Sequence, residues 1–346
     1  MLKVTVGDVR KIVRPKKGSH KGQNGRLLLI GGSTLFHAAS LWSLTVASRI
    51  VDLVHYASVP ENNEIVLQAK KEFRNGIVIS RRDIESYIEE DDVILIGPGM
   101  TRDSETEELT NRLLKKYSKK QWVIDAGALQ MMDVALIPLG AILTPHHGEF
   151  LSLISRAEVA STLGANKDLN PSIGAEVVRP NSGVFRSLAS TRAPSAENSN
   201  LSDLPAPHGG LSSLASLSDE DRVKMFANAH SCIVLLKGEK DIVCQAKRDT
   251  ASRDEGGSCA GKICVPTECR VITGGNEGMT KGGTGDVLAG LIAALACTND
   301  PFLATIVGSF INKAAGDTLY KTVGPYFNAS DLADQIPKTM KALLND

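Results

Sequence analysis

The chain has 346 residues, and its 39 Lys and Arg balance 39 Asp and Glu, so the formal net charge at pH 7 is zero. This balance argues against nucleic-acid and anionic-membrane binders, which rely on an excess of basic charge. Hydrophobic residues make up 42% of the chain, enough to bury a large core. The longest apolar run, residues 287–297, is too short to span a bilayer, and the first residues do not resemble a secretory signal. We therefore expect a soluble, cytoplasmic, globular protein.

Short runs that are apolar throughout recur along the chain, and helical stretches separate them. We expect strands at residues 26–30, 53–59, 92–96, 121–124, 141–143, 232–236 and 241–244. Expected helices include residues 38–50, 104–116 and 218–229, the last with Ser218 as N-cap. Runs without alternation suit strands that are covered on both faces, as in a parallel sheet. The pattern predicts a doubly wound α/β fold with a mostly parallel central sheet, helices on both faces, and ligands at the carboxyl ends of the strands.

Two stretches do not fit this pattern. Residues 155–217 are rich in Ser, Pro and Gly with little periodicity, and residues 247–259 are strongly charged. We expect both to be surface insertions in a single domain that spans residues 1–346. The six cysteines are too few to form a disulfide framework in a chain of this length, and Cys259, Cys264 and Cys269 lack the spacing of a metal site.

The strongest chemical signal is the run Gly-Gly-Thr-Gly-Asp at residues 282–286, which leads directly into an apolar helix. Unpaired backbone amides at a helix N-terminus can enclose a phosphate, and the helix dipole adds to the attraction. A carboxylate in this first turn, Asp286, can act as a general base on an attacking hydroxyl. The simpler interpretation of Asp286 is an ordinary capping residue beside a flexible turn.

Other polar or glycine-containing turns follow other expected strands. They are Gly97-Pro98-Gly99, Asp125, the segment Thr-Pro-His-His-Gly-Glu at residues 144–149, and Lys237-Gly238. Each alone is explained by a turn or a cap. The two histidines of residues 146–147 lack helical zinc spacing, and at most one of them should face the site, since neighbours on an extended segment point in opposite directions. Glu149 is suited to support a phosphate-bound magnesium ion that keeps most of its waters.

Taken together and in this order, these motifs resemble the ADP-dependent NAD(P)H-hydrate dehydratase family, a branch of the ribokinase-like superfamily. The segments that carry the resemblance are residues 21–26, 31–33, 96–99, 125–126, 144–149, 237–238, 276–279 and 282–286. The Gly-Thr-Gly-Asp element is typical of the superfamily. The combination of Thr-Pro-His-x-Gly-Glu with Asn-x-Gly-Met narrows the resemblance to the dehydratases. The resemblance implies a ribokinase-like fold.

The resemblance also implies a reaction, in which ADP phosphorylates the ring hydroxyl of the S-epimer of hydrated NADH or NADPH. Loss of phosphate then restores the intact cofactor and leaves AMP. Carried over residue by residue, Asp286 becomes the base and a substrate contact, and Glu149 supports magnesium indirectly. The other expected substrate contacts are Ala39, Gly97, Gly99 and His146. The expected nucleotide contacts are Lys237, Gly238, Glu239, Lys240, Asp241, Gly283, Thr284 and Gly285.

The resemblance further implies a homo-oligomer, such as a tetramer, and an NAD(P)H-hydrate epimerase supplied by a separate protein. Two other functions remain open. An ATP-dependent kinase of a small hydroxylated metabolite would use the same base and anion-binding turn. A nucleotide-sensing scaffold would need the amides alone, and the presence of Asp286 argues against it.

Overall fold

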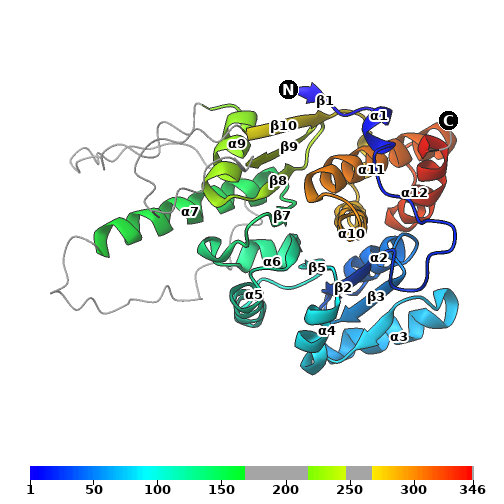
Figure 1. Cartoon of the computed structure of the whole chain (residues 1–346), viewed down its shortest axis with the longest axis horizontal. Coiled ribbons are helices and arrows are strands. Elements are labelled where there is room, and N and C mark those ends of the chain that lie inside the picture. Colours follow the sequence, from blue (N-terminus) through cyan, green and yellow to red (C-terminus); the bar gives the residue numbers. More distant parts are fainter. Residues whose placement is uncertain (168–216, 247–266, 345–346) are drawn as a thin grey trace, which may run out of the picture.

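The computed structural model describes residues 1–167, 217–246 and 267–344, and their strands form one ten-stranded sheet (Figure 1). The strand order is β1-β10-β9-β8-β7-β6-β5-β2-β3-β4. Adjacent strands are parallel, except that β9 is antiparallel to both β8 and β10. The strand bounds are β1 Leu2–Lys3, β2 Arg26–Ile30, β3 Leu53–Ala57, β4 Ile77–Ile79, β5 Val93–Ile96, β6 Gln121–Ile124, β7 Ile142–Leu143, β8 Ile233–Leu236, β9 Asp241–Ala246 and β10 Thr267–Ile272.

Helices cover both faces of this sheet. One face packs against α1 Val6–Val9, α2 His37–Ala47, α3 Pro60–Phe73, α10 Thr284–Ala296, α11 Pro301–Val323 and α12 Ala329–Leu344. The other face packs against α4 Ile84–Glu90, α5 Ser104–Lys116, α6 Ala126–Met131, α7 His147–Lys167 and α9 Asp219–His230. Among the described residues, no helix is both long and apolar enough to cross a membrane.

The central strand β2 explains why the apolar runs do not alternate. Leu27 and Leu29 point into the core on the side of α10, whereas Leu28 and Ile30 point into the core on the side of α5. All four side chains are fully buried. A strand between two helical layers has no solvent face, so every position must be apolar. The doubly wound fold predicted from the sequence is confirmed.

Several element bounds also agree with the sequence. Strands β2 and β6 and helix α5 begin and end where predicted. Ser218 is the N-cap of α9, and its hydroxyl accepts a hydrogen bond from the amide of Asp221 at 3.2 Å. Helix α10 begins at Thr284, so part of the glycine-rich run lies inside the helix.

The expected insertions are described only in part. Residues 155–167, at the start of the first one, continue helix α7. Residues 168–216 and the whole of 247–259 lie outside the described residues.

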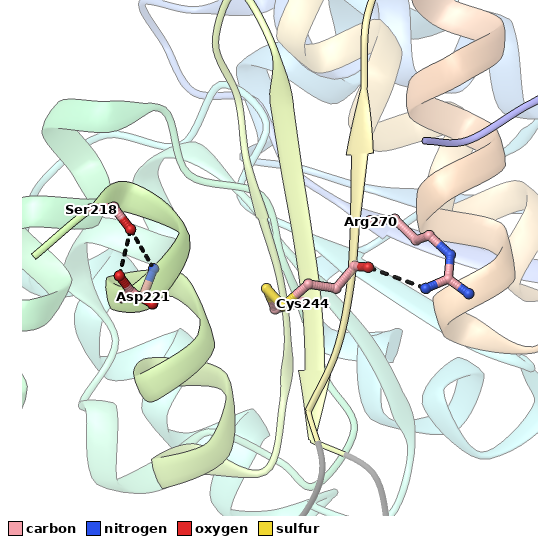
Figure 2. The surroundings of a disulfide bond; sticks show 5 residues. Ser218, Asp221, Cys244 and Arg270 are labelled. Atoms are coloured by element: carbon pink, nitrogen blue, oxygen red, sulfur yellow. Dashed lines mark hydrogen bonds between the residues drawn. A yellow bond between two sulfur atoms is a disulfide. The ribbon is translucent and has the colours of Figure 1, made fainter. Parts of the chain in front are cut away.

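One feature was not predicted from the cysteine content. Cys244 on β9 and Cys269 on β10 face each other across the antiparallel pair and form a disulfide. Figure 2 shows this bond on the side of the sheet that faces α9. The partner of Cys269 is thus set by the register of β9 against β10, which the spacing of the cysteines in the sequence does not reveal. The other two cysteines of the spaced set, Cys259 and Cys264, lie outside the described residues.

Gly290 of α10 allows this helix to pack closely against α2. This close packing fixes the position of the N-terminus of α10. A Cβ atom on Gly290 would lie 2.6 Å from the carbonyl oxygen of Ser43 and 2.7 Å from its Cα.

We expect Gly290→Ala to lower the free energy of unfolding by about 1–3 kcal/mol, because the two helix backbones must separate. Chemical denaturation measures this change. Gly7→Ala, at an exposed helical position with room for a methyl group, is the control, and an equal loss there would contradict the explanation.

Candidate active site

Four adjacent strands end in turns that contain residues predicted from the sequence to contact the substrate or the nucleotide. Strands β5, β6, β7 and β8 are parallel neighbours, so their carboxyl ends meet at one edge of the sheet. The residues that follow them are Gly97, Asp125, Thr144 and Lys237. The N-terminus of α10 reaches the same edge, because Lys237 lies next to Gly285. The structure thus brings together motifs that are far apart in the chain, as an open α/β sheet requires.

A cavity of about 760 Å³ opens beside this edge, within the range of about 300–1,000 Å³ typical of small-molecule sites. It is lined by the expected residues His146, Lys237, Gly238, Glu239, Asp241, Thr284 and Gly285. A smaller cavity of about 560 Å³, between Ile12, Arg49 and Cys297, contains none of the expected site residues. The larger cavity is therefore the candidate nucleotide site.

The first turn of α10 has the geometry of an anion site. Gly283 is its N-cap with φ +95°, and a Cβ atom there would lie 2.2 Å from the ring of Trp42. Only glycine fits this position. The hydroxyl of Thr284 donates to the carbonyl oxygens of Met279 and Lys281, which fixes the approach to the helix. The amide of Thr284 donates to the carbonyl oxygen of Lys281 at 3.4 Å, and the amide of Val287 donates to that of Gly283 at 3.0 Å. The amides of Gly285 and Asp286, between them, have no backbone acceptor among the described residues, so they can face a phosphate.

Asp286 lies in this turn and is partly exposed. The preceding residue, Gly285, lines the cavity, whereas Asp286 does not. Burial, together with the charge of Asp125, raises the pKa of the Asp286 carboxyl to about 7, although Lys237 acts in the opposite direction. The backbone carbonyl of Asp286 accepts a hydrogen bond from the hydroxyl of Ser43 at 2.7 Å, which anchors the turn to α2. A carboxyl group with this pKa can accept a proton near neutral pH.

Lys237 is held between this turn and the end of β6. Its ammonium donates to Oδ1 of Asp125 at 3.0 Å, and a Cβ atom on Gly285 would lie 3.5 Å from Lys237 Nζ. Burial alone would lower the pKa of Lys237, but the charges of Asp125, Glu149 and Asp286 outweigh this effect and raise it. The lysine therefore stays charged beside the first turn of α10.

The two adjacent histidines point in different directions, as the sequence predicted. His146 lines the cavity. His147 is directed to α9, where its Nε2 lies 3.4 Å from Oδ1 of Asp219. At most one histidine therefore faces the site.

Glu149 is buried, and both of its carboxylate oxygens already accept hydrogen bonds. The amide of His146 donates to Oε2 at 2.9 Å, and Nε2 of Gln130 donates to Oε1 at 2.8 Å. Among the described residues, no group of three His, Cys, Asp or Glu side chains could hold a metal ion. These residues do not fit a dedicated metal site. They fit only a magnesium ion held mainly by water and by phosphate oxygens, with Glu149 as a nearby charge.

The expected dinucleotide contacts form a separate group at the end of β5. A Cβ atom on Gly97 would lie 1.7 Å from the carbonyl oxygen of Asp125, so glycine is required there by packing. A Cβ atom on Gly99 would lie 3.0 Å from Cβ of Ala39. Ala39, Gly97 and Gly99 do not line the larger cavity, in contrast to His146.

Sequence reasoning missed Lys313, which shapes the loop at residues 237–241. Its ammonium donates to the carbonyl oxygens of Gly238 and Glu239 at 3.0 and 3.2 Å, and lies 3.2 Å from Oδ1 of Asp241. The other oxygen of Asp241 accepts from the hydroxyl of Ser309 at 2.7 Å. A lysine inside the otherwise largely apolar middle of α11 is the signal in the sequence that could have revealed it.

The raised pKa of Asp286 predicts how stability changes with pH. Between the ordinary pKa of 3.8 and about 7, the folded protein keeps a proton that the unfolded chain releases, so the wild type loses stability as pH rises. Asp286→Asn removes this loss. The variant should gain on the order of 1–3 kcal/mol over the wild type between pH 4 and 7, because one pKa unit corresponds to about 1.4 kcal/mol and water screens the charge. Denaturation at several pH values measures the difference, and a constant difference would contradict the assignment.

Comparison with known proteins places the chain in a family. A family model for NAD(P)H-hydrate dehydratase matches residues 27–182 and 206–338. The bifunctional NAD(P)H-hydrate repair enzyme Nnr of Methanocaldococcus jannaschii is 29% identical over 345 residues, which cover 97% of this chain and 52% of that protein. The chain spans about half the length of the curated relatives of this bifunctional kind. The ADP-dependent (S)-NAD(P)H-hydrate dehydratase of Nitrosopumilus maritimus is 28% identical, covering 98% of this chain and 96% of that protein.

Solved structures agree on the fold. A ribokinase-like superfamily protein of Enterococcus faecalis superimposes with a TM-score of 0.68 at 18% identity, covering 100% of this chain and 97% of that one. The ADP/ATP-dependent NAD(P)H-hydrate dehydratase of Bacillus subtilis, co-crystallised with ATP and Mg²⁺, gives 0.63 at 18% identity, covering 99% and 98%. The fold is ribokinase-like, and by the extent of the family match the chain belongs to the NAD(P)H-hydrate dehydratase family.

Proposed function

We propose that this protein catalyses the ADP-dependent dehydration of the S-epimer of hydrated NADH and NADPH, acting as a hydro-lyase that repairs nicotinamide nucleotides. The observation that carries the proposal is the position of Asp286. Its carboxyl has a pKa of about 7 and lies in an anion-binding turn, beside a charged lysine and a cavity suited to a nucleotide. Family membership and the names of the full-length relatives support the same activity.

The chemistry follows from the poor leaving ability of hydroxide. Asp286 accepts the proton of the ring hydroxyl as its oxygen attacks the β-phosphorus of ADP, and the bond from phosphorus to the AMP oxygen breaks. The amides of the α10 turn and Lys237 stabilise the charge on the transferred phosphoryl group. The ring nitrogen then supplies electrons as phosphate departs with the former hydroxyl oxygen. Loss of a proton from the neighbouring ring carbon restores the double bond, so ADP and the hydrate yield AMP, phosphate, a proton and the intact cofactor.

We assign the remaining expected contacts within the same proposal. The nucleotide would contact Lys237, Gly238, Glu239, Lys240, Asp241, Gly283, Thr284 and Gly285. The hydrated dinucleotide would contact Ala39, Gly97, Gly99, His146 and Asp286. Magnesium, carried by the phosphates and by water with Glu149 nearby, would reduce the negative charge that opposes attack on phosphorus.

The wider organisation is also part of the proposal. The chain forms one domain over residues 1–346 with surface insertions at 155–217 and 247–259, and the gap in the family match supports only the part of the first insertion at residues 183–205. The homo-oligomer, the separate epimerase and the cytoplasmic location stay predictions from the sequence.

The choice of donor tests the reaction class. We expect hydrated NADH with ADP to regain the absorbance of NADH and to release one AMP and one phosphate per turnover. The same incubation with ATP measures the donor preference. A phosphorylated product that persists without elimination would favour the metabolite kinase, and nucleotide binding without any turnover would favour the scaffold.

Asp286→Asn tests the base. Loss of a general base should lower kcat by about 10²–10⁴-fold, whereas ADP and AMP should still raise the melting temperature, because the amides and Lys237 remain. In the wild type, kcat/KM should fall as pH drops below about 7, since the protonated carboxyl cannot accept a proton. Turnover of the variant at the wild-type rate would show that another group is the base.

A further inference from the structure

We propose that Asp125 is a positioning residue for the reaction. It holds the ammonium of Lys237 against the first turn of α10, so that this ammonium contacts the transferred phosphoryl group. The inference rests on the proposed function and adds a residue that acts through another one. It also explains how Lys237 is held in place for the role in the chemical step that the proposed function gives it.

The carboxylate of Asp125 is not used to cap the helix that follows it. Asp125 is the N-cap of α6, but its side chain makes no capping hydrogen bond to that helix. Instead, Oδ1 accepts from the hydroxyl of Thr144 at 2.7 Å and from the ammonium of Lys237 at 3.0 Å. An aspartate at an N-cap normally satisfies helix amides. Here the carboxylate is directed across the strand ends toward the lysine.

The backbone of Asp125 is fixed on both sides. Its carbonyl packs against Gly97 so closely that no side chain fits there. The next residue, Ala126, has φ +44°, a conformation that residues other than glycine seldom adopt. Asp125 itself is only 2% exposed. The carboxylate is therefore held in one place, as a positioning group requires.

The side chain of Lys237 ends beside the first turn of α10. Its ammonium lies at the cavity wall, within van der Waals distance of the position that a Cβ on Gly285 would take. The amides of the α10 turn would bind the phosphoryl group from one side. The ammonium lies on an adjoining side, where negative charge develops during transfer and again when phosphate leaves.

The loop that follows Lys237 is held independently of Asp125. The amide of Gly238 donates to Oδ1 of Asp241 at 3.0 Å, and the ammonium of Lys313 holds the carbonyl oxygens of residues 238 and 239. Removing the charge of Asp125 should therefore release the lysine ammonium without moving the nucleotide loop. This separation predicts a loss in kcat with little change in nucleotide affinity.

The charges around Asp286 give a second measurable consequence, a shift in the pH at which this carboxyl takes up a proton. The groups that act on Asp286 come from three elements: Asp125 before α6, Glu149 on α7 and Lys237 after β8. The charge of Asp125 raises the pKa of Asp286, whereas that of Lys237 lowers it. His146 lies in the same cavity wall. Neutralising Asp125 and neutralising Lys237 should thus shift the protonation of Asp286 in opposite directions.

The experiment compares Asp125→Asn and Lys237→Gln with the wild type in the full chain, using ADP and hydrated NADH. We expect Asp125→Asn to lower kcat by about 10- to 100-fold, as for other residues that orient a reacting group. Its KM for ADP and its affinity for AMP should change by less than about threefold. The acid limb of its kcat/KM profile should move to lower pH. In Lys237→Gln, kcat should also fall, but the acid limb should move to higher pH.

Two further variants keep the result interpretable. Asp133→Asn, the same exchange at an exposed position beyond the other end of α6, should leave kcat and the pH profile unchanged. If Asp125→Asn does not fold, Thr144→Val removes the hydroxyl that orients Asp125 while keeping the side-chain shape. It should lower kcat several-fold at constant KM for ADP.

The outcomes separate this inference from the proposed function. A wild type that does not dehydrate hydrated NADH would contradict the proposed function itself. If the wild type is active, an unchanged kcat in Asp125→Asn would overturn the inference alone. So would equal losses in kcat/KM and AMP affinity, or acid limbs that move in the same direction in both variants, because these results indicate a merely structural role.

Discussion

The ammonium of Lys237 lies between the carboxylate of Asp125 and the first turn of α10, in a region largely screened from water. A buried charge is tolerated only when opposite charges and hydrogen bonds replace the water that it loses. Asp125, Glu149 and Asp286 provide this compensation, and each comes from a different element of the fold. Burial at this place would lower the pKa of the lysine, so the sheet order, the turn after β6 and the start of α10 must all be correct for it to stay charged there. In the same arrangement, burial and the charge of Asp125 raise the pKa of the Asp286 carboxyl to about 7.

Close backbone packing keeps these groups in place. Gly283 lies against Trp42, Gly97 against the carbonyl of Asp125, and Gly290 against the backbone of Ser43. At each of these points a side chain would push two elements apart. The glycines thus set the distance between the helix N-terminus and the strand ends, and the distance sets the strength of the electrostatic interactions among the charged groups.

Two ion pairs divide the site between them. The pair of Asp125 and Lys237 lies at the anion-binding turn, where the phosphoryl group is expected. The pair of Asp241 and Lys313 lies under the loop that follows β8 and fixes the backbone of that loop beside the cavity. Because the two pairs share no residue, we expect a substitution in one pair to leave the other pair in place. This division is consistent with a protein that binds a nucleotide and also acts on its phosphate.

The sequence by itself determined the layers of the fold and the elements that carry the chemistry. Runs such as residues 26–30 are apolar throughout only if both faces of the strand are covered, and a glycine-rich run before an apolar helix predicts an anion-binding turn. The tertiary structure decided which of these elements are neighbours. Asp125 and Lys237 are 112 residues apart, and neither residue indicates its partner locally. Lys313 and the disulfide between Cys244 and Cys269 were missed for the same reason. Periodicity reports whether a residue is buried, whereas pairing depends on strand order and register, which arise only when the whole sheet packs.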